Sequence, residues 1–110
     1  MAVNAPFTPS GNTVTFTAAT TAPAAVQAVS TTLGGNQYRI LNAGSVTAFL
    51  GIGTTAALAN SAAAVVTSSG QAIPLLAGTD EILSFLPNAY FTASTGSSSA
   101  VIYVTPGDGQ

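Results

Sequence analysis

The sequence predicts an all-β protein, an antiparallel β-sandwich or jelly-roll-like barrel of about seven to nine short strands. Threonine, valine, isoleucine and small residues are abundant, and β-branched residues favour strands. The 11 glycines and 6 prolines recur at short intervals and mark turns. Because these turn signals lie about 8 to 12 residues apart, an alternation of strands with long helices is not expected.

A short arm is expected to precede the folded domain. Residues 1–12 contain Pro6, Pro9 and Gly11 and predict an extended N-terminal arm. Residues 13–110 are numerous enough to bury one core, so they predict a single β-sandwich domain. The start of the chain has neither a positively charged region nor an apolar one, and it therefore predicts no secretion signal.

Alternation of apolar and polar residues marks the first strands. In residues 12–20, Val14 and Phe16 alternate with threonines, which predicts a half-buried strand. A weaker alternation in residues 24–32 predicts a second strand. This strand is expected to end at the Gly-Gly-Asn turn signal of residues 34–36.

Residues 37–53, with the sequence QYRILNAGSVTAFLGIG, predict a β-hairpin. Its loop is the Asn-Ala-Gly of residues 42–44, in which Gly44 suits the left-handed position of a type I turn with a bulge. This loop places Leu41 opposite Ser45, so alternate side chains fall on opposite faces. The core face then carries Tyr38, Ile40, Val46, Ala48 and Leu50, and the other face carries Arg39, Leu41, Thr47 and Phe49.

The alanine-rich stretch of residues 53–64 leaves two readings open. Alanine is the best helix former, so two turns of helix around residues 56–63 are compatible with it. A loop is equally compatible, and in either case a strand is expected to resume at residues 63–68.

Proline and glycine also delimit the last strands. Pro74 cannot donate a hydrogen bond to a ladder, so it predicts an edge strand or the start of a strand. Later strands are expected at residues 80–86, 89–94 and 101–104, with a turn at Pro87-Asn88 and a stop at Pro106-Gly107.

The composition removes most catalytic chemistry. The chain contains no histidine, no cysteine and a single basic residue, Arg39. It therefore lacks the usual general base at neutral pH, a thiolate nucleophile and a Schiff-base amine. Serine and threonine are abundant, but a hydroxyl nucleophile needs a base to activate it. The sequence predicts a protein that is not an enzyme and that uses no cofactor.

The low charge restricts the partners. Only 4% of the residues are charged and the net charge is -2, so no basic surface is available to neutralise phosphates. Binding to nucleic acid or to an anionic membrane is therefore not expected. Apolar runs end well before the about 20 residues that a membrane-spanning helix needs. Charged surface residues normally prevent small domains from associating in solution. A surface with so few charges therefore favours a protein that is a subunit of a larger assembly.

The few acidic residues do not form a recognisable site. Asp80 and Glu81 are adjacent in an expected strand, so their side chains point to opposite faces and cannot converge on a proton or a metal. Asp108 lies between glycines, where an aspartate is typical of a turn. Gly51 and Gly53 follow a strand, but the remaining features of a dinucleotide-binding motif are missing.

One face of the expected hairpin is a candidate interface. It mixes a guanidinium, an aromatic ring and an aliphatic side chain, a combination that interfaces favour. A buried Arg39 would need a partner, so we expect it to pair with Asp80 or Glu81 on a neighbouring strand, or with a group on another subunit. The predicted interface residues are Arg39, Leu41, Thr47, Phe49, Asp80 and Glu81. The aromatic residues are also compatible with a carbohydrate- or receptor-binding module. This module is the alternative function that the residues by themselves leave open.

Three segments carry a resemblance to a known class of proteins. They are YRILNAGSVTAFLGIGTTA, IPLLAGTDEILSFLPNAYFTAST and the terminal AVIYVTPGDGQ, within residues 37–110. Their pattern of strands and turns resembles small structural proteins encoded among the head and tail genes of tailed bacteriophages. Residues 1–36 have no such resemblance, and no functional residue is transferred by it.

The resemblance implies a β-sandwich component of a virion that is assembled in the host cytoplasm. The expected function is that of a capsid decoration, or cement, protein that binds the major capsid protein or other virion proteins and forms homo-oligomers. A head-to-tail component or a tail or fibre component is the alternative within the same class.

Overall fold

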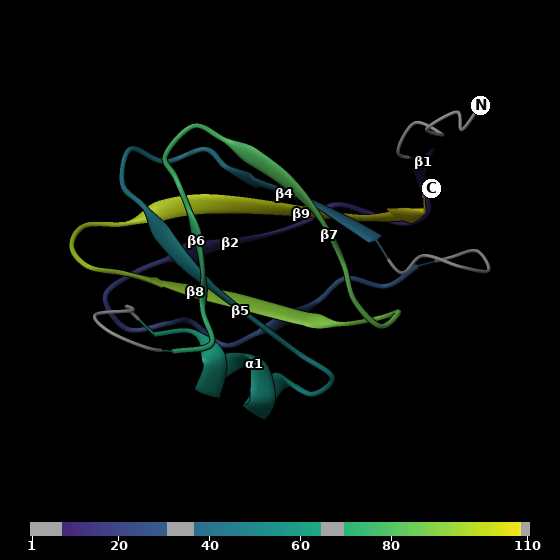
Figure 1. Cartoon of the computed structure of the whole chain (residues 1–110), viewed down its shortest axis with the longest axis horizontal. Helices are drawn as coiled ribbons and strands as arrows, with labels where there is room; N and C mark the ends of the chain where they lie inside the picture. The colour runs from purple at the N-terminus through teal and green to yellow at the C-terminus, as the bar shows by residue number, and fades with distance from the viewer. Residues whose placement is uncertain (1–7, 31–36, 65–69, 109–110) are drawn as a thin grey trace.

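Two antiparallel β-sheets pack face to face and form a β-sandwich (Figure 1). The computed structural model describes residues 8–30, 37–64 and 70–108, which contain nine strands and one short helix. The first sheet consists of β2 (Val14–Ala18), β9 (Ala100–Asp108), β4 (Gln37–Asn42) and β7 (Asp80–Ser84) in that order, with β1 (Thr8–Pro9) on the same edge of β9 as β2. The second sheet consists of β3 (Val26–Gln27), β8 (Tyr90–Thr95), β5 (Ala48–Gly53) and β6 (Ile73–Leu75), with α1 (Ala56–Ala62) after β5. The predicted antiparallel sandwich is confirmed.

Nearly every connection takes the chain from one sheet to the other. Among the elements in the described ranges, only the β1–β2 link and the helical β5–α1–β6 connection stay within a sheet. Most strands that follow one another in sequence therefore lie in opposite layers, and β5 and β6 are the only paired strands in the described ranges that are neighbours in sequence. The pairing of β2 with β9, which sets Val14 beside Val104, joins strands that are far apart along the chain.

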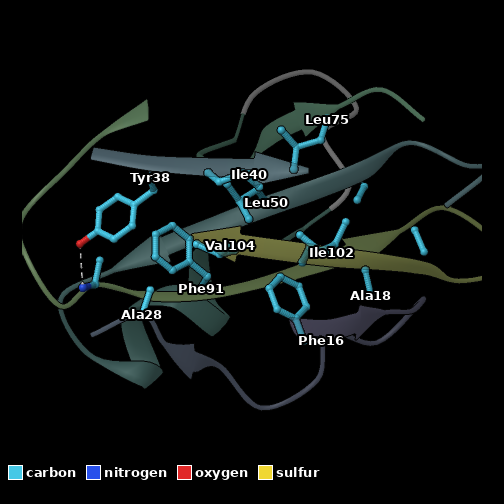
Figure 2. Close-up of a cluster of buried hydrophobic side chains, with 14 residues drawn as sticks. Phe16, Ala18, Ala28, Tyr38, Ile40, Leu50, Leu75, Phe91, Ile102 and Val104 are labelled. Atoms are coloured by element: carbon cyan, nitrogen blue, oxygen red, sulfur yellow. Dashed lines mark hydrogen bonds between the residues drawn. The ribbon is translucent and has the colours of Figure 1, made fainter. Parts of the chain in front are cut away.

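The inner faces of the two sheets supply a closely packed core (Figure 2). Tyr38 and Phe91 meet edge to face across the two sheets, with ring centroids 4.8 Å apart. The predicted core positions Tyr38, Ile40, Ala48 and Leu50 are fully buried, and Val46 packs against the core from the β4–β5 connection. The core is completed by Phe16, Ala18, Ala28, Leu75, Ala89, Ala93, Ala100, Ile102 and Val104.

The buried tyrosine of this core, Tyr38, has its hydroxyl group hydrogen-bonded on both sides. Tyr38 Oη donates to the carbonyl of Leu86 at 2.5 Å and accepts from the backbone N–H of Ala89 at 3.1 Å, the bond drawn in Figure 2. Burial raises the pKa of the Tyr38 hydroxyl, and the backbone hydrogen bonds from Ala89 and Asn88 only partly oppose that rise.

The hairpin predicted for residues 37–53 is wrong, although both of its strands are present. β4 and β5 lie in different sheets, so Leu41 is opposite Asp80 and Tyr103 rather than Ser45. Gly44 does not act as a left-handed turn residue. A Cβ at this position would lie 2.5 Å from the Cβ of Ala100, so glycine is needed here for close packing where the chain crosses between the sheets.

A buried asparagine holds this crossing in place. Asn42 is completely buried, and its amide nitrogen donates to the carbonyls of Val46 at 3.0 Å and Leu75 at 2.9 Å. Its amide oxygen accepts from the N–H of Gly44 at 2.9 Å. These three bonds hold the chain where it crosses from the first sheet to the second. A hairpin loop would instead return the chain to a neighbouring strand of the same sheet.

The alanine-rich stretch forms a helix, which decides between the two readings left open. Thr55 caps α1 by accepting from the N–H of Leu58 at 3.2 Å. The helix lies on the outside of the second sheet against Gly51, where a Cβ would come within 2.3 Å of the Ala59 carbonyl oxygen. Of the strand expected at residues 63–68, residues 65–69 lie outside the described residues and residues 63 and 64 are not in a strand.

The ends of the described chain meet in the first sheet. β9 does not stop at Pro106-Gly107, because it continues to Asp108 and pairs with β1. Pro106 is buried, and its carbonyl accepts from the N–H of Ser10 at 2.9 Å. Thr8 and Pro9 of the predicted N-terminal arm therefore form an edge strand of the sheet, and residues 1–7 lie outside the described residues.

The other expected strands are present with small shifts. β2, β7 and β8 fall within or beside their predicted ranges, and β6 is an edge strand that contains Pro74, as expected. The strand expected at residues 24–32 is reduced to the two residues of β3 among those described. Asn88 has a φ of 59° in the predicted Pro87-Asn88 turn.

Candidate interaction surface

The solvent-facing side of the first sheet is the best candidate for a functional surface. Cross-strand pairs align its side chains in rows, one of which runs from Thr15 through Tyr103 and Leu41 to Asp80. We call this surface the outer face. It consists of Thr15 and Thr17 of β2, Val101, Tyr103 and Thr105 of β9, Arg39 and Leu41 of β4, and Asp80, Ile82 and Ser84 of β7.

The outer face presents apolar groups and hydroxyl groups with very little charge. Val101, Tyr103 and Ile82 keep 36%, 39% and 53% of their surface exposed. Threonines lie opposite two of these side chains, Thr17 opposite Val101 and Thr15 opposite Tyr103, and the hydroxyls of Thr13 and Thr105 share a hydrogen bond of 2.7 Å. Exposed aromatic and aliphatic side chains with neutral hydrogen-bonding neighbours are typical of the centre of a protein–protein interface, where charged residues are depleted.

Arg39 pairs with Asp80, as the first alternative of the prediction expected. Its Nη2 and Nε lie 2.7 Å and 2.9 Å from the same oxygen, Oδ2 of Asp80. The two side chains are 51% and 46% exposed, so solvent screens their attraction. An ion pair of this kind contributes about 0 to 1 kcal/mol to folding stability. Its main consequence is to neutralise the positive charge on the outer face.

The six predicted interface residues do not form one surface. Arg39, Leu41 and Asp80 share the outer face. Phe49 pairs with Ser94 and Pro74 in the second sheet and belongs to its outer side, because its neighbour Leu50 faces the core. This part of the prediction is wrong for the same reason as the hairpin.

Two other predicted positions also lie away from the outer face. Thr47 is in the connection between the sheets. Glu81 is opposite Ile40 and so lies on the inner side of β7, where it is exposed because β7 is at the edge of its sheet.

Several residues of the outer face were missed by the sequence reasoning. Val101, Tyr103 and Ile82 all lie in strands that were predicted, but the presence of a strand does not say which of its faces is covered. The sequence correctly predicts that Thr13, Thr15 and Thr17 lie on the other face of their strand from Phe16. This row of threonines was the one sequence feature that pointed to the solvent-facing side of the sheet.

A hollow lies on the outer face beside the ion pair. It has a volume of about 530 Å³ and is lined by Pro9, Gly11, Thr13, Arg39, Ile82 and Thr105. The guanidinium and two hydroxyl groups give it hydrogen-bonding capacity, and Ile82 gives it an apolar side.

A second cavity lies where the two sheets open between β6 and β7. It has a volume of about 250 Å³, and most of its lining is apolar. Leu83 of β7 and Phe85, which directly follows β7, line one side, and Ile52 and Ile73 of the second sheet line the other. These four side chains are partly exposed extensions of the core.

The described residues contain no constellation for metal binding, since no three acidic, histidine or cysteine residues gather within the described ranges. No helix of the described chain is long and apolar enough to cross a membrane. Comparisons with known proteins add no identity: no family model matches the chain, and searches of curated proteins and of solved structures return no match.

Proposed function

We propose that this protein is a non-enzymatic structural protein of a phage virion, and that it decorates and stabilises the capsid. In this proposal the sandwich is a jelly roll. The strand orders β2-β9-β4-β7 and β3-β8-β5-β6 support this assignment, because a jelly roll divides eight strands between two four-stranded sheets in this manner. Jelly rolls are common in viral capsid domains and in lectins.

The observation that carries the proposal is the neutral outer face. The first sheet exposes Tyr103, Val101 and Ile82 among threonines, and its single basic side chain is paired with Asp80. A free domain in solution normally covers such a face with charged residues. A domain whose outer face is permanently bound to another protein does not need charged residues on that face to stay soluble.

The mechanism is mechanical. The outer face binds the major capsid protein or another virion protein and buries apolar and hydroxyl groups between neighbouring subunits. Each contact is small, but a repeated lattice makes many contacts available to an oligomer, so weak individual binding gives strong overall attachment. Neither nucleic acid nor a membrane takes part, since the net charge is -2.

Binding to undecorated capsids tests the proposal directly. Tyr103→Lys places a charge at the centre of the outer face and is expected to weaken binding by about tenfold or more, the scale of an interfacial hot spot. Leu58→Lys is the matched control, because Leu58 is 55% exposed on α1 outside the second sheet. If both variants bind alike, the outer face is not the binding surface.

Arg39→Ala separates assembly from folding. Removing a half-exposed ion pair is expected to change the unfolding free energy by at most about 1 kcal/mol. Capsid binding should fall further, because Asp80 is then left unpaired in the contact. Equal losses in folding and in binding would contradict an interface role for Arg39.

The hollow beside Arg39 favours a carbohydrate- or receptor-binding module as the second candidate. Thr13, Thr105 and Arg39 could offer hydrogen bonds to sugar hydroxyls there. Electron microscopy of labelled virions distinguishes the candidates. Regularly spaced copies over the whole shell support decoration, whereas a few copies at one vertex or on the tail support the receptor-binding or tail alternative.

A further inference from the structure

The strand β7 is an edge strand that is open to solvent on both of its faces. Four of its five residues are exposed, and only Leu83 is half-buried. On one side β7 pairs with β4, and no strand in the described ranges pairs with its other side. An edge of this kind presents unpaired backbone groups that can accept another strand.

The ladder between β4 and β7 fixes which backbone groups face outwards. Asn42 N–H donates to the carbonyl of Thr79 at 2.9 Å, so this pair is a hydrogen-bonded one. Hydrogen-bonded and non-hydrogen-bonded pairs alternate along an antiparallel ladder. Glu81 and Leu83 are therefore bonded to β4, whereas the N–H and C=O groups of Ile82 and its second neighbours, Asp80 and Ser84, point away from the sheet.

We infer that two copies of this chain pair through β7, antiparallel and about a two-fold axis that passes beside Ile82. In this register each Ile82 lies opposite the Ile82 of the second copy, and each Asp80 lies opposite a Ser84. All three outward-facing residues of each copy then exchange backbone hydrogen bonds. The first sheets of the two copies join into one continuous sheet.

The charges of β7 favour this register over its neighbours. Asp80 and Glu81 both lie in the first half of the strand. Pairing about Ile82 places them opposite Ser84 and Leu83, which are uncharged. A register centred near Asp80 would set carboxylates directly opposite one another, an arrangement that destabilises a strand pair. The acidic residues therefore select one pairing and oppose the others.

Apolar exposure at the same edge also favours a second copy. Ile82 is 53% exposed in β7 and Leu86 is 58% exposed just beyond it. The two-fold pairing covers Ile82 with its own counterpart. A symmetric dimer contact of this kind uses the same patch on both subunits, so it needs no second complementary surface.

The other edges of the sandwich are less suited to strand addition. β6 has three residues and contains Pro74, which lacks an N–H, and β3 has two residues. Beside β2, the bridges Gly11–Ser30 and Ala19–Ser94 link neighbouring segments of the chain.

This dimer deepens the proposed function, because it names one contact through which copies assemble and rests on that function only for its biological use. Joining the sheets through β7 places two outer faces side by side, so one dimer can engage two capsid sites. A dimer without capsid binding would overturn the proposed function alone. Capsid binding by a protein that stays monomeric would overturn this contact alone.

A pair of opposite charges at position 82 tests the inference. Because the axis sets residue 82 opposite itself, Ile82→Lys and Ile82→Glu should each weaken dimerisation by about tenfold or more. An equimolar mixture of the two variants should restore dimers at low salt. Sedimentation equilibrium up to millimolar protein measures the masses, and circular dichroism confirms that each variant is folded. The matched control is Val101→Lys, which places the same charge on the outer face away from the edge and should leave the dimer intact.

A single cysteine gives an independent test, because the natural chain contains none. Opposed residues in a hydrogen-bonded pair have Cα atoms about 5.5 Å apart, within the range of a disulfide. Ile82→Cys should therefore form a covalent dimer under mild oxidation, whereas Val101→Cys should not. A wild-type protein that is monomeric at all concentrations, a mixture that does not restore dimers, or equal cross-linking of the two cysteine variants would overturn the inference.

Discussion

At the scale of single residues, Asn42 determines where the chain leaves the first sheet. It is completely buried, and three hydrogen bonds engage both of its amide N–H groups and its amide oxygen. Its partners are backbone groups of the β4–β5 connection and of β6, so one side chain joins both sheets. The sequence offered Asn42 only as a turn residue, because an asparagine before Ala-Gly is equally typical of a hairpin loop.

Replacing Asn42 should destabilise the fold strongly. Asn42→Ala leaves two carbonyl groups and one N–H without their partner, which costs about 2 to 4 kcal/mol in the free energy of unfolding. Asn42→Asp should cost at least as much, since a carboxylate oxygen would then face the carbonyls of Val46 and Leu75. Urea denaturation measures both changes. Asn12→Ala is the control, because Asn12 is exposed, and a similar loss there would contradict a specific role for Asn42.

Tyr38 should make the stability of the fold sensitive to alkaline pH. Burial raises the pKa of its hydroxyl in the folded state, so the unfolded chain loses this proton first, at about pH 10. Stability contributed by the neutral hydroxyl is therefore complete below that pH and is lost as the pH rises through the unfolded and then the folded pKa.

Comparison with Tyr38→Phe isolates this effect. At neutral pH the variant should be less stable by about 1 to 3 kcal/mol, because Leu86 C=O and Ala89 N–H lose their partner. The difference between the two proteins should shrink above about pH 10. Denaturation midpoints from neutral pH to pH about 11 measure it. A difference that stays constant over this range would mean that the hydroxyl does not titrate differently on folding.

At the scale of elements, local patterns predicted most strands, whereas the pairing partners required information that lies far along the chain. The alternation in β2 and the prolines around β6 and β7 act within a few residues, and those strands were found. The neighbours of β4 are β7 and β9, whose partners for Arg39 are Ile82 and Thr105. The residues between Arg39 and Phe49 predict a hairpin when only neighbouring residues are considered. In the structure, pairing with strands distant in sequence places β4 and β5 in different sheets instead.

The candidate site shows the same difference between features that local sequence predicts and features that depend on long-range pairing. The Arg39–Asp80 pair was predictable because the chain has one basic side chain and few acidic ones. Phe49 was assigned to the wrong surface because its position depends on which sheet holds β5. The exposure of Tyr103 and Ile82 depends on which face of the first sheet remains uncovered, and no local pattern records that.

Helix α1 depends on glycine at the strand beneath it. A Cβ on residue 51 would lie 2.3 Å from Ala59 O and 2.6 Å from Ala63 N, and these backbone atoms cannot move aside without displacing the helix. Gly51→Ala should therefore lower the unfolding free energy by about 1 to 3 kcal/mol, the cost of overpacking. Thermal unfolding measures the change.

Gly96→Ala is the matched control for this packing effect. A Cβ at residue 96 meets nothing within 4 Å, so this substitution should be neutral or slightly stabilising. If the two alanine variants unfold at the same temperature, close packing of α1 on β5 does not explain the glycine.

At the scale of the whole molecule, stability comes from burial and hydrogen bonding with almost no contribution from charge. One basic and three acidic side chains serve 110 residues, and one half-exposed ion pair joins two of them in the described ranges. A sandwich of this kind gains little from attraction between charges and suffers little from repulsion. The same scarcity of charge leaves the outer face nearly neutral, apart from the Arg39–Asp80 pair.

The unfolding free energy should therefore respond to the kind of salt rather than to ionic strength. Sodium chloride up to about 1 M screens only weak surface interactions, so it should change stability by less than about 1 kcal/mol. Sodium sulfate at equal ionic strength should stabilise the protein clearly, because excluded salts strengthen the burial of apolar surface. Urea denaturation in the two salts measures the difference, with Arg39→Ala as the variant from which the ion pair is missing. A marked loss of stability of the wild type in sodium chloride, absent in Arg39→Ala, would show that the Arg39–Asp80 pair contributes more than its half-exposed geometry allows.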